Sequence, residues 1–334
     1  MRPVRVASIG VGWWSGVLAE AARKGTGLEL VACTSRTADK RMAFARTHGC
    51  REAPSYEAVL ADPEVEAVLI ATPHSVHAEQ VVTAARAGKH VFVDKPFTLN
   101  AAEGRQATEA CRRADVTLAV GHQRRKHPAI RAVKRMIDEG ALGRVVQIEG
   151  NMSADVGFKL APGMWRTVRA ETPAGAMTNL GIHHVDTYQY LLGPIARVMA
   201  FSRRVALAAL EIDDTTSILF EFASGGLGYL GTSWVHANRT ADITLHGTEA
   251  QAHIGADGTQ LSLAKRGQTP SSAVPLEPVD AIVAELAEFA RCVRDGSRPE
   301  VGGEEATADI AVLDAIVESA ASGRAVAVEQ EAGR

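Results

Sequence analysis

Two glycines close to the N-terminus, Gly10 and Gly12, are followed by Ser15 at the third position of a G-x-G-x-x-G spacing. Glycine permits a tight turn and a close approach of the backbone to phosphate, and a following helix offers free N–H groups and a positive dipole end. Ser15 is small enough for close helix–strand packing, and its hydroxyl can reach a phosphate. Trp13 and Trp14 either wall a bound molecule or pack inside the protein. The spacing predicts a dinucleotide-binding turn; an ordinary glycine-containing βα turn is the alternative.

The end of the second strand bears on the choice between NAD and NADP. An NAD site places an acid there to accept hydrogen bonds from both ribose hydroxyls. Glu29 lies at the wrong end of the strand, and the first acid beyond it is Asp39. Ser35 and Arg36 instead offer donors and a positive charge, which suit a 2′-phosphate. We expect NADP rather than NAD; the alternative is a solvated Arg36 that stacks on the adenine.

Short apolar runs alternate with helical patterns over the first 120 residues, and these elements must position the turn. Such alternation indicates βαβ units in a doubly wound parallel sheet. The expected strands are residues 4–9, 28–34, 67–71, 90–93 and 116–120. The expected helices are residues 15–24, 38–47, 76–87 and 101–113.

The pattern changes after residue 122, so we expect two α/β domains, residues 1–122 and 123–334. A helix over 128–139 leads to a strand over 144–152, and another helix begins near Asn179. A succession of strands over 198–263, joined by short turns, favours an antiparallel or mixed sheet. Two helices, residues 280–294 and 304–321, close the chain.

Composition excludes several classes of protein. With 46% hydrophobic and 22% charged residues among 334, the chain resembles an ordinary globular enzyme. A formal net charge of −3 gives no basic field for nucleic acid or anionic lipid. No signal peptide and no membrane-length apolar run is evident. The four cysteines match no zinc or C-x-x-C spacing, so we expect free thiols and a cytoplasmic location.

Three further segments make the chain recognisable. Residues 71–77 read ATPHSVH, residues 87–96 read AGKHVFVDKP and residues 175–186 read GAMTNLGIHHVD. Together with the glycine turn they resemble the Gfo/Idh/MocA oxidoreductase family over nearly the whole chain. The resemblance is most specific at Asp-Lys-Pro, where the family usually has Glu-Lys-Pro, and at Asn-x-Gly-x-His, where it usually has Asp-x-Gly-x-His.

This resemblance implies a Rossmann domain followed by an α/β domain with a large, mostly antiparallel open sheet. A small-molecule substrate would bind between them, and the sheet would mediate a homodimer or homotetramer. The family's lysine corresponds to Lys95, its catalytic histidine to His183 and its aspartate to Asn179. The matching motifs also assign cofactor contacts to Thr72, Pro73, His77, Asp94 and Lys95.

Elementary chemistry supports those roles. Oxidising an alcohol moves a hydride to the nicotinamide and needs a base for the hydroxyl proton. His183 can accept that proton, and Lys95 can hydrogen-bond the substrate oxygen and stabilise a developing alkoxide. Asn179, one helical turn earlier, can orient His183 but brings no negative charge. We therefore expect a less basic His183 than an aspartate would give.

The remaining candidates have competing interpretations. Arg166, beside Trp165, either binds substrate or forms a structural ion pair, and His122 and Arg124 follow the last Rossmann strand at the expected edge of the cleft. Lys95 and His183 taken singly could also be a loop lysine and a helix-end histidine. A metal site from His183, His184 and Asp186 is disfavoured because adjacent helical residues point about 100° apart, so we expect none.

The sequence thus predicts an NAD(P)-dependent oxidoreductase acting on a sugar, inositol or cyclic diol. Two other functions stay open. One is a dinucleotide-sensing regulator without turnover, which the missing aspartate would favour. The other is a glycosidase that holds NAD tightly and oxidises its substrate transiently.

Overall fold

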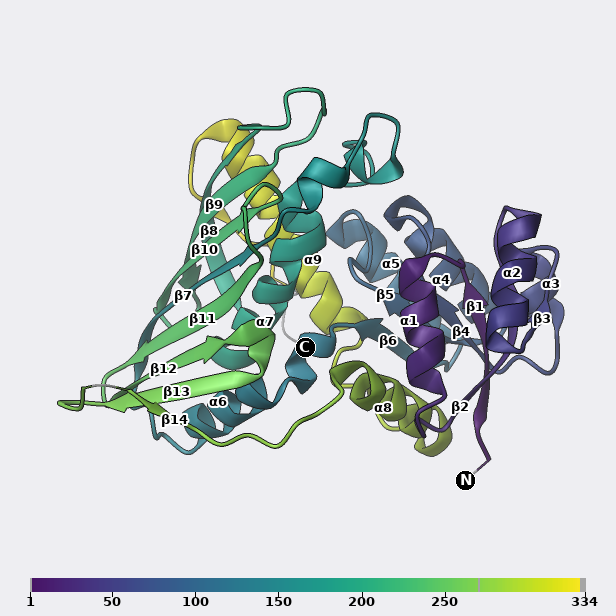
Figure 1. Cartoon of the computed structure of the whole chain (residues 1–334), viewed down its shortest axis with the longest axis horizontal. Coiled ribbons are helices and arrows are strands. Elements are labelled where there is room, and N and C mark those ends of the chain that lie inside the picture. The colour runs from purple at the N-terminus through teal and green to yellow at the C-terminus, as the bar shows by residue number, and fades with distance from the viewer. Residues whose placement is uncertain (1, 270, 331–334) are drawn as a thin grey trace. The chain divides into compact units, whose positions relative to one another are not determined.

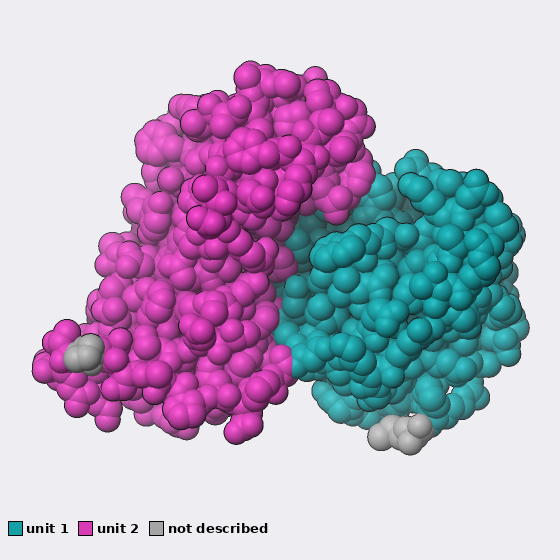
Figure 2. All heavy atoms as spheres, in the orientation of Figure 1, with its two compact units in different colours: residues 1–123, 280–307 teal, residues 124–279, 308–334 magenta. Residues whose placement is uncertain are grey.

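A computed structural model of the chain describes residues 2–269 and 271–330. The chain forms two compact units, which Figure 2 colours differently. Unit 1 comprises residues 1–123 and 280–307, and unit 2 comprises residues 124–279 and 308–334. The chain therefore leaves unit 1 after residue 123, returns to it at residue 280 and leaves it again after residue 307.

Unit 1 is built on a six-stranded parallel sheet in the order β3-β2-β1-β4-β5-β6. This confirms the expected doubly wound Rossmann sheet. The strand order reverses between β1 and β4, which is where such sheets bind ligands outside the carboxyl ends of their strands. The strands are β1 (Val4–Ile9), β2 (Leu28–Thr34), β3 (Arg51–Glu52), β4 (Ala67–Ile70), β5 (His90–Asp94) and β6 (Leu118–Gly121).

The helices that connect these strands begin where the sequence offers caps. Ser55 accepts a hydrogen bond from the amide of Ala58, and Asn100 accepts one from the amide of Glu103. The helices are α1 (Trp13–Ala22), α2 (Ala38–His48), α3 (Tyr56–Ala61), α4 (His77–Arg86) and α5 (Ala101–Arg113). The short strand β3 and helix α3 were not among the expected elements.

Helix α8 (Ala281–Asp295) packs in unit 1, although it follows about 150 residues of unit 2. Its buried residues Leu286, Phe289 and Ala290 share one apolar core with Val4 of β1 and Leu18 of α1. The ring of Phe289 meets that of Phe92 edge-on, with 5.8 Å between the ring centroids. The sequence predicts this helix in a continuous second domain; the structure differs because the apolar face of α8 packs into the core of unit 1.

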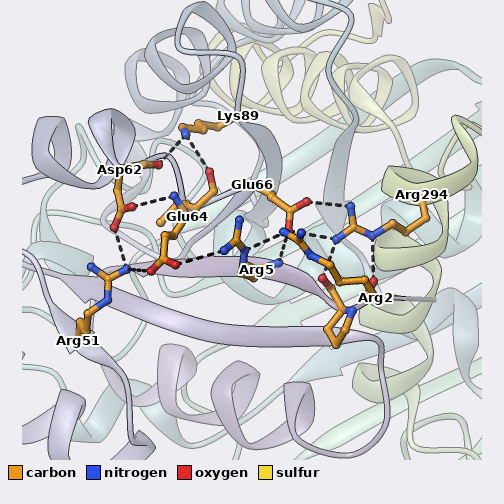
Figure 3. Close-up of polar contacts among 10 residues, drawn as sticks. Arg2, Arg5, Arg51, Asp62, Glu64, Glu66, Lys89 and Arg294 are labelled. Carbon is orange, nitrogen blue, oxygen red and sulfur yellow. Dashed lines mark hydrogen bonds and ion pairs between the residues drawn. The ribbon is translucent and has the colours of Figure 1, made fainter.

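An ion-pair network also attaches α8 to the sheet (Figure 3). Arg294 of α8 donates through Nη1 to Glu66 Oε1 at 2.9 Å, and the Arg5 amide donates to Glu66 Oε2 at 3.0 Å. The hydrogen bond from Arg294, helped by the Arg5 amide and the charge of Arg2, lowers the pKa of Glu66 to about 2. Glu66 therefore stays ionised and tethers α8 at ordinary pH.

Unit 2 contains a nine-stranded sheet in the order β14-β13-β12-β11-β7-β10-β9-β8-β15. Every neighbouring pair is antiparallel except β7 and β10, which confirms the expected mostly antiparallel sheet. The strands are β7 (Val145–Ser153), β8 (Ile195–Arg203), β9 (Thr215–Phe222), β10 (Leu227–Ser233), β11 (Thr240–Gly247), β12 (Ala250–Gly255), β13 (Gln260–Lys265), β14 (Ser272–Ala273) and β15 (Val326–Ala327).

Within the described part of the chain, helices cover one face of this sheet and leave the other bare (Figure 1). They are α6 (Pro128–Asp138), α7 (Ile182–Leu192) and most of α9 (Gly303–Ser322). The opposite face exposes Phe201, Leu219, Leu227 and Tyr229 from β8, β9 and β10. Leu219 is in register with Tyr229 on one side and Met199 on the other, so these apolar side chains form a continuous patch.

Across residues 2–269 and 271–330, no helix combines the length and the apolar character that crossing a membrane requires.

Candidate active site

The glycine turn joins β1 to α1 at the point where the strand order reverses. Gly10 has φ of +96°, and a Cβ there would lie 2.6 Å from the carbonyl oxygen of Ala71, so only glycine fits. Gly12 is the N-cap of α1 and has a negative φ, and a Cβ there would meet nothing within 4 Å. Gly12 makes no side-chain capping hydrogen bond to the helix. The turn thus presents backbone N–H groups beside open space, which fits a dinucleotide pyrophosphate.

The residues after Gly12 have different surroundings. Trp13 is 80% exposed, whereas Trp14 is half-buried and packs against the core of unit 1. Ser15 is buried, and no other described residue hydrogen-bonds its hydroxyl. Its position fits the close helix–strand packing expected at the third position of the glycine motif.

At the carboxyl end of β2, a loop carries the residues that we expect to recognise the ribose of the dinucleotide. Arg41 braces this loop by donating through Nη1 to the carbonyl of Ser35 at 2.9 Å and through Nε to Glu52 at 2.8 Å. Arg36 is exposed and forms no ion pair with any described residue. The first acid beyond the strand, Asp39, is exposed in the first turn of α2.

The carboxyl ends of β4 and β5 carry the other motif residues of unit 1. The buried ring of His77 bridges them, with Nδ1 2.9 Å from the Pro96 carbonyl and Nε2 3.0 Å from the Thr72 carbonyl. The Thr72 hydroxyl donates to Gln80 Oε1 at 2.7 Å. Asp94 ends β5, and Lys95 follows it, half-buried. The motif residues Thr72, Pro73, His77, Asp94 and Lys95 therefore gather at one edge of the sheet, where His77 holds two loops together.

In unit 2, Asn179 and His183 lie four residues apart on one helical segment. The segment begins with a π-helix over Met177–Gly181 and continues without a break into α7, so Asn179 lies inside the π-helix and His183 in the first turn of α7. A Cβ on Gly181 would lie 2.1 Å from the sulfur of Met177. Short π-helical segments occur frequently at functional sites. The sequence predicted a helix beginning near Asn179 but not its π geometry.

Helix α7 packs against the sheet at Gly150 of β7. A Cβ at Gly150 would lie 2.7 Å from the Tyr188 hydroxyl and 3.1 Å from His184 Cδ2, so the glycine allows this close approach. Tyr188 donates to the carbonyl of Tyr229 at 3.0 Å, and His184 Nε2 donates to the carbonyl of Asp242 at 3.1 Å. Complete burial, assisted by the charge of Arg124, lowers the pKa of His184 to about 3. His184 is therefore a neutral packing residue.

Asp186, the third member of the disfavoured metal set, also has a contact of its own. Arg125 donates through Nε to Asp186 Oδ1 at 2.9 Å, and Nη2 lies 2.7 Å from the same oxygen. The Arg125 guanidinium lies over the ring of Tyr190, 5.1 Å from its centroid. His184 thus hydrogen-bonds to strand β11, and Asp186 pairs with Arg125.

Three of the remaining substrate candidates belong to unit 2, and His122 belongs to unit 1. Trp165 and Arg166 form a cation–π pair in a short 3₁₀-helix, with the guanidinium carbon 4.2 Å from the ring centroid. Arg124 is buried and forms an ion pair with Asp257, which Arg239 also contacts at 2.8 Å. His122 is buried directly after β6. The predicted substrate residues are therefore divided between the two units.

Sequence reasoning missed two buried residues that contact α7. The sequence motifs include neither Arg125 nor Asp309. Both are buried, and Asp309 stands alone as an acid in the apolar stretch Ala308–Leu313 of α9. An isolated acid in an otherwise apolar helix is the signal that could have found it.

Comparisons with known proteins place the chain in a family. A family model described as an oxidoreductase family with an NAD-binding Rossmann fold matches residues 4–122. A second, described as the GFO/IDH/MocA C-terminal domain, matches residues 130–253. The chain belongs to the GFO/IDH/MocA oxidoreductase family. It is an NAD(P)-binding oxidoreductase, and the expected membership is confirmed.

Curated relatives in this family include sugar and inositol enzymes. The chain is 28% identical over 311 residues to 1,5-anhydro-D-fructose reductase of Ensifer adhaerens, covering 92% of this chain and 93% of that protein. It is 31% identical over 293 residues to scyllo-inositol 2-dehydrogenase (NAD⁺) of Bacillus subtilis, covering 81% and 80%.

Solved structures in the family share the whole fold. A candidate NADPH-dependent oxidoreductase from Desulfitobacterium hafniense superposes with a TM-score of 0.93 at 34% identity, covering 98% of both chains. Levoglucosan dehydrogenase in complex with NADH and levoglucosan superposes with a TM-score of 0.92 at 23% identity, covering 98% of this chain and all of that one. The second likeness concerns the fold alone.

Proposed function

We propose that this oxidoreductase transfers hydride between the nicotinamide of NADP and a hydroxyl-bearing carbon of a sugar, inositol or cyclic diol. The observation that carries the proposal is the turn at Gly10 and Gly12. It opens free backbone donors onto unfilled space at the switch point of the sheet, and Lys95 follows a strand of the same carboxyl edge. A dinucleotide on this edge and a substrate beside Lys95 are what that arrangement favours.

The residues divide the chemistry as follows. A bound nicotinamide supplies the hydride acceptor or donor. The Lys95 ammonium hydrogen-bonds the substrate oxygen and stabilises negative charge as it develops there. His183 takes the hydroxyl proton in oxidation and returns it in reduction. Asn179 orients His183 without adding charge, and a pH–rate profile of Asn179→Asp that overlays the wild type would count against that assignment.

NADP is favoured over NAD by the charge at the end of β2. Arg36 is exposed and forms no ion pair within the described part of the chain, and residues 34–38 include no acid. Arg41 holds the Ser35 backbone in place, so the loop is braced before any ligand binds. A 2′-phosphate would gain a charge-assisted hydrogen bond from Arg36, whereas two free ribose hydroxyls would find no carboxylate there.

The substrate class rests on the relatives, whose names include a D-xylose 1-dehydrogenase (NADP⁺) and a D-apiose dehydrogenase. Two other functions make different predictions. A sensor would bind NADP and turn nothing over. A glycosidase would keep its dinucleotide through purification and show no net change in it during turnover.

Self-association through the bare face of the nine-stranded sheet is part of this proposal. The patch of Phe201, Leu219, Leu227 and Tyr229 is apolar, and each side chain is at least 36% exposed. Contiguous exposed apolar surface of this kind marks an interface. A second copy of the chain is the occupant we propose, because two such faces are self-complementary about a two-fold axis.

The test is nicotinamide absorbance during incubation with polyols, inositols, aldoses and cyclic diols, each with NAD and with NADP. We expect stoichiometric turnover of NADP with at least one substrate class. Lys95→Ala should abolish turnover, while Lys40→Ala, on the exposed surface of α2, should leave it intact. Tight NADP binding without turnover across the panel would overturn the enzymatic proposal in favour of a sensor.

A further inference from the structure

Two buried aspartates meet between helices of unit 2. Asp186 belongs to α7 and Asp309 to α9, and neither side chain has any exposed surface. An oxygen of each carboxyl group lies within 4.8 Å of an oxygen of the other. Two carboxylates buried this close together repel each other, so the pair is expected to share one proton.

The neighbouring groups decide which aspartate holds it. Arg125 contacts Asp186 through Nε and Nη2, which favours the charged form of Asp186. Asp309 Oδ1 accepts a hydrogen bond from Gln189 Nε2 at 2.8 Å, which a neutral carboxyl group can do equally well. Burial and the charge of Asp186 raise the pKa of Asp309 well above its usual value. These surroundings favour a neutral Asp309, which can then donate to the Asp186 carboxylate.

These contacts converge on the helix that begins with His183. Asp186 lies one turn after His183, and Gln189 lies one turn after Asp186, on the same face. Gln189 Oε1 also accepts a hydrogen bond from the amide of Ile195, just beyond the helix, at 3.2 Å. Both α7 residues reach Asp309 of α9, so the pair fixes the rotation of α7 about its axis and its position along α9.

We propose that Asp309 is a positioning residue for the reaction, acting as a neutral carboxylic acid that holds α7, and with it His183, through Asp186 and Gln189. The inference rests on the proposed function for the role of His183, and on α7 and α9 alone for the contacts. Asp309 lies more than 120 positions after His183 in the sequence.

Two substitutions of similar volume separate this role from mere space filling. Asp309→Asn keeps a donor for Asp186 and an acceptor for Gln189, and we expect kcat within about twofold of wild type. Asp309→Leu keeps neither, and we expect kcat to fall by ~10- to 100-fold with the dissociation constant for NADP unchanged, because small displacements of catalytic groups have effects of this size. Equal impairment of both variants, or a Leu variant with wild-type kcat, would refute the proposal.

A double-mutant cycle tests the shared proton without any turnover. In Asp186→Asn, Asp309 can ionise and keep a negative charge near Arg125; in Asp309→Asn, Asp186 does so. The double variant removes both carboxylates, so its fall in melting temperature should far exceed the summed effects of the single changes. Additive losses would overturn the shared proton. A melting experiment needs no substrate. It therefore tests the pairing of the two aspartates even if the proposed activity is wrong.

Discussion

His184 Nε2 and the carbonyl oxygen of Asp242 are 3.1 Å apart, and this single hydrogen bond ties helix α7 to strand β11. The neighbouring His183, one residue earlier, points about 100° away around the helix. His184 is thus neutral and fixed in the core, whereas the neighbouring His183 is the residue that we propose for proton transfer.

Acid should destabilise the protein through His184. The pKa of this ring is about 3 in the folded state, against 6.5 for an ordinary histidine. Its neutral form therefore contributes stability that is fully present above pH 6.5 and is lost as pH falls towards 3, by about 1.4 kcal/mol per pH unit. Urea unfolding at pH 7, 6 and 5 measures this slope. His184→Gln, which keeps an N–H donor, should reduce the slope, whereas His236→Gln on the exposed surface should not.

The two glycines of the turn should respond differently to alanine. Gly10→Ala places a Cβ 2.6 Å from a carbonyl oxygen at φ of +96°, so we expect about 1–3 kcal/mol of lost stability. Gly12→Ala fills open space, so the melting temperature of the protein without cofactor should stay within about 2 °C of wild type. Its dissociation constant for NADP should nevertheless rise at least ~10-fold, about 1.4 kcal/mol. An unchanged affinity would remove the pyrophosphate from this turn.

Arg36→Asp should reverse the choice of cofactor. The change removes a charge-assisted hydrogen bond to the 2′-phosphate, for which we expect NADP affinity to fall by ~10- to 100-fold, about 1.4–2.8 kcal/mol. NAD affinity should stay the same or improve. Fluorescence titration with both dinucleotides measures the ratio. Arg46→Asp, exposed on α2, is the matched control, and an NADP/NAD ratio unaltered in Arg36→Asp would sink the assignment.

Glu66→Gln should loosen α8 from the sheet. The Glu66 carboxylate is only 24% exposed and has a pKa of about 2, so its contribution is present above pH 4.5 and is lost as pH falls towards 2. We expect the variant to lose about 1–3 kcal/mol at pH 7 and to show a flatter acid limb between pH 4.5 and 2. Glu64→Gln, whose own carboxylate is 58% exposed, should cost no more than about 1 kcal/mol. Comparable losses in both variants would argue against the anchoring role of Glu66.

Leu219→Lys should separate the proposed oligomer. Leu219 is 59% exposed in the middle of the apolar patch, and two copies facing each other would bring the new charges together. Sedimentation should show the wild type as a dimer or larger and the variant shifted towards the monomer. Val317→Lys, on α9 at the helical side of the sheet, should leave the assembly unchanged. A wild type that sediments as a monomer at micromolar concentration would refute the proposed interface.

Much of the fold follows from local signals in the sequence. The apolar runs of β1, β2, β4 and β5 and the helix over Ala101–Arg113 were predicted within a residue or two, because buried parallel strands and capped amphipathic helices have distinct periodicities. The glycine turn could also be predicted, since Gly10 has a positive φ that other residues avoid. These features depend on neighbours in the chain.

What the sequence could not give depends on distant contacts. The π-helix at Met177–Gly181 adds no periodicity of its own over five residues. The pairing of Asp186 with Asp309 joins residues from separate helices, and the placement of α8 in unit 1 depends on an apolar face that would fit many cores. Such features become visible only when the tertiary packing is known.

The late return of α8 has a consequence for how the chain is made. The N-terminal unit keeps part of its apolar core uncovered until Leu286 and Phe289 have left the ribosome. At ordinary rates of synthesis, roughly 10–30 s pass between the appearance of the last strand of that sheet and of the helix that covers it. During that interval chaperones can bind the exposed apolar surface of the sheet. A chain truncated after residue 123 would keep that surface exposed.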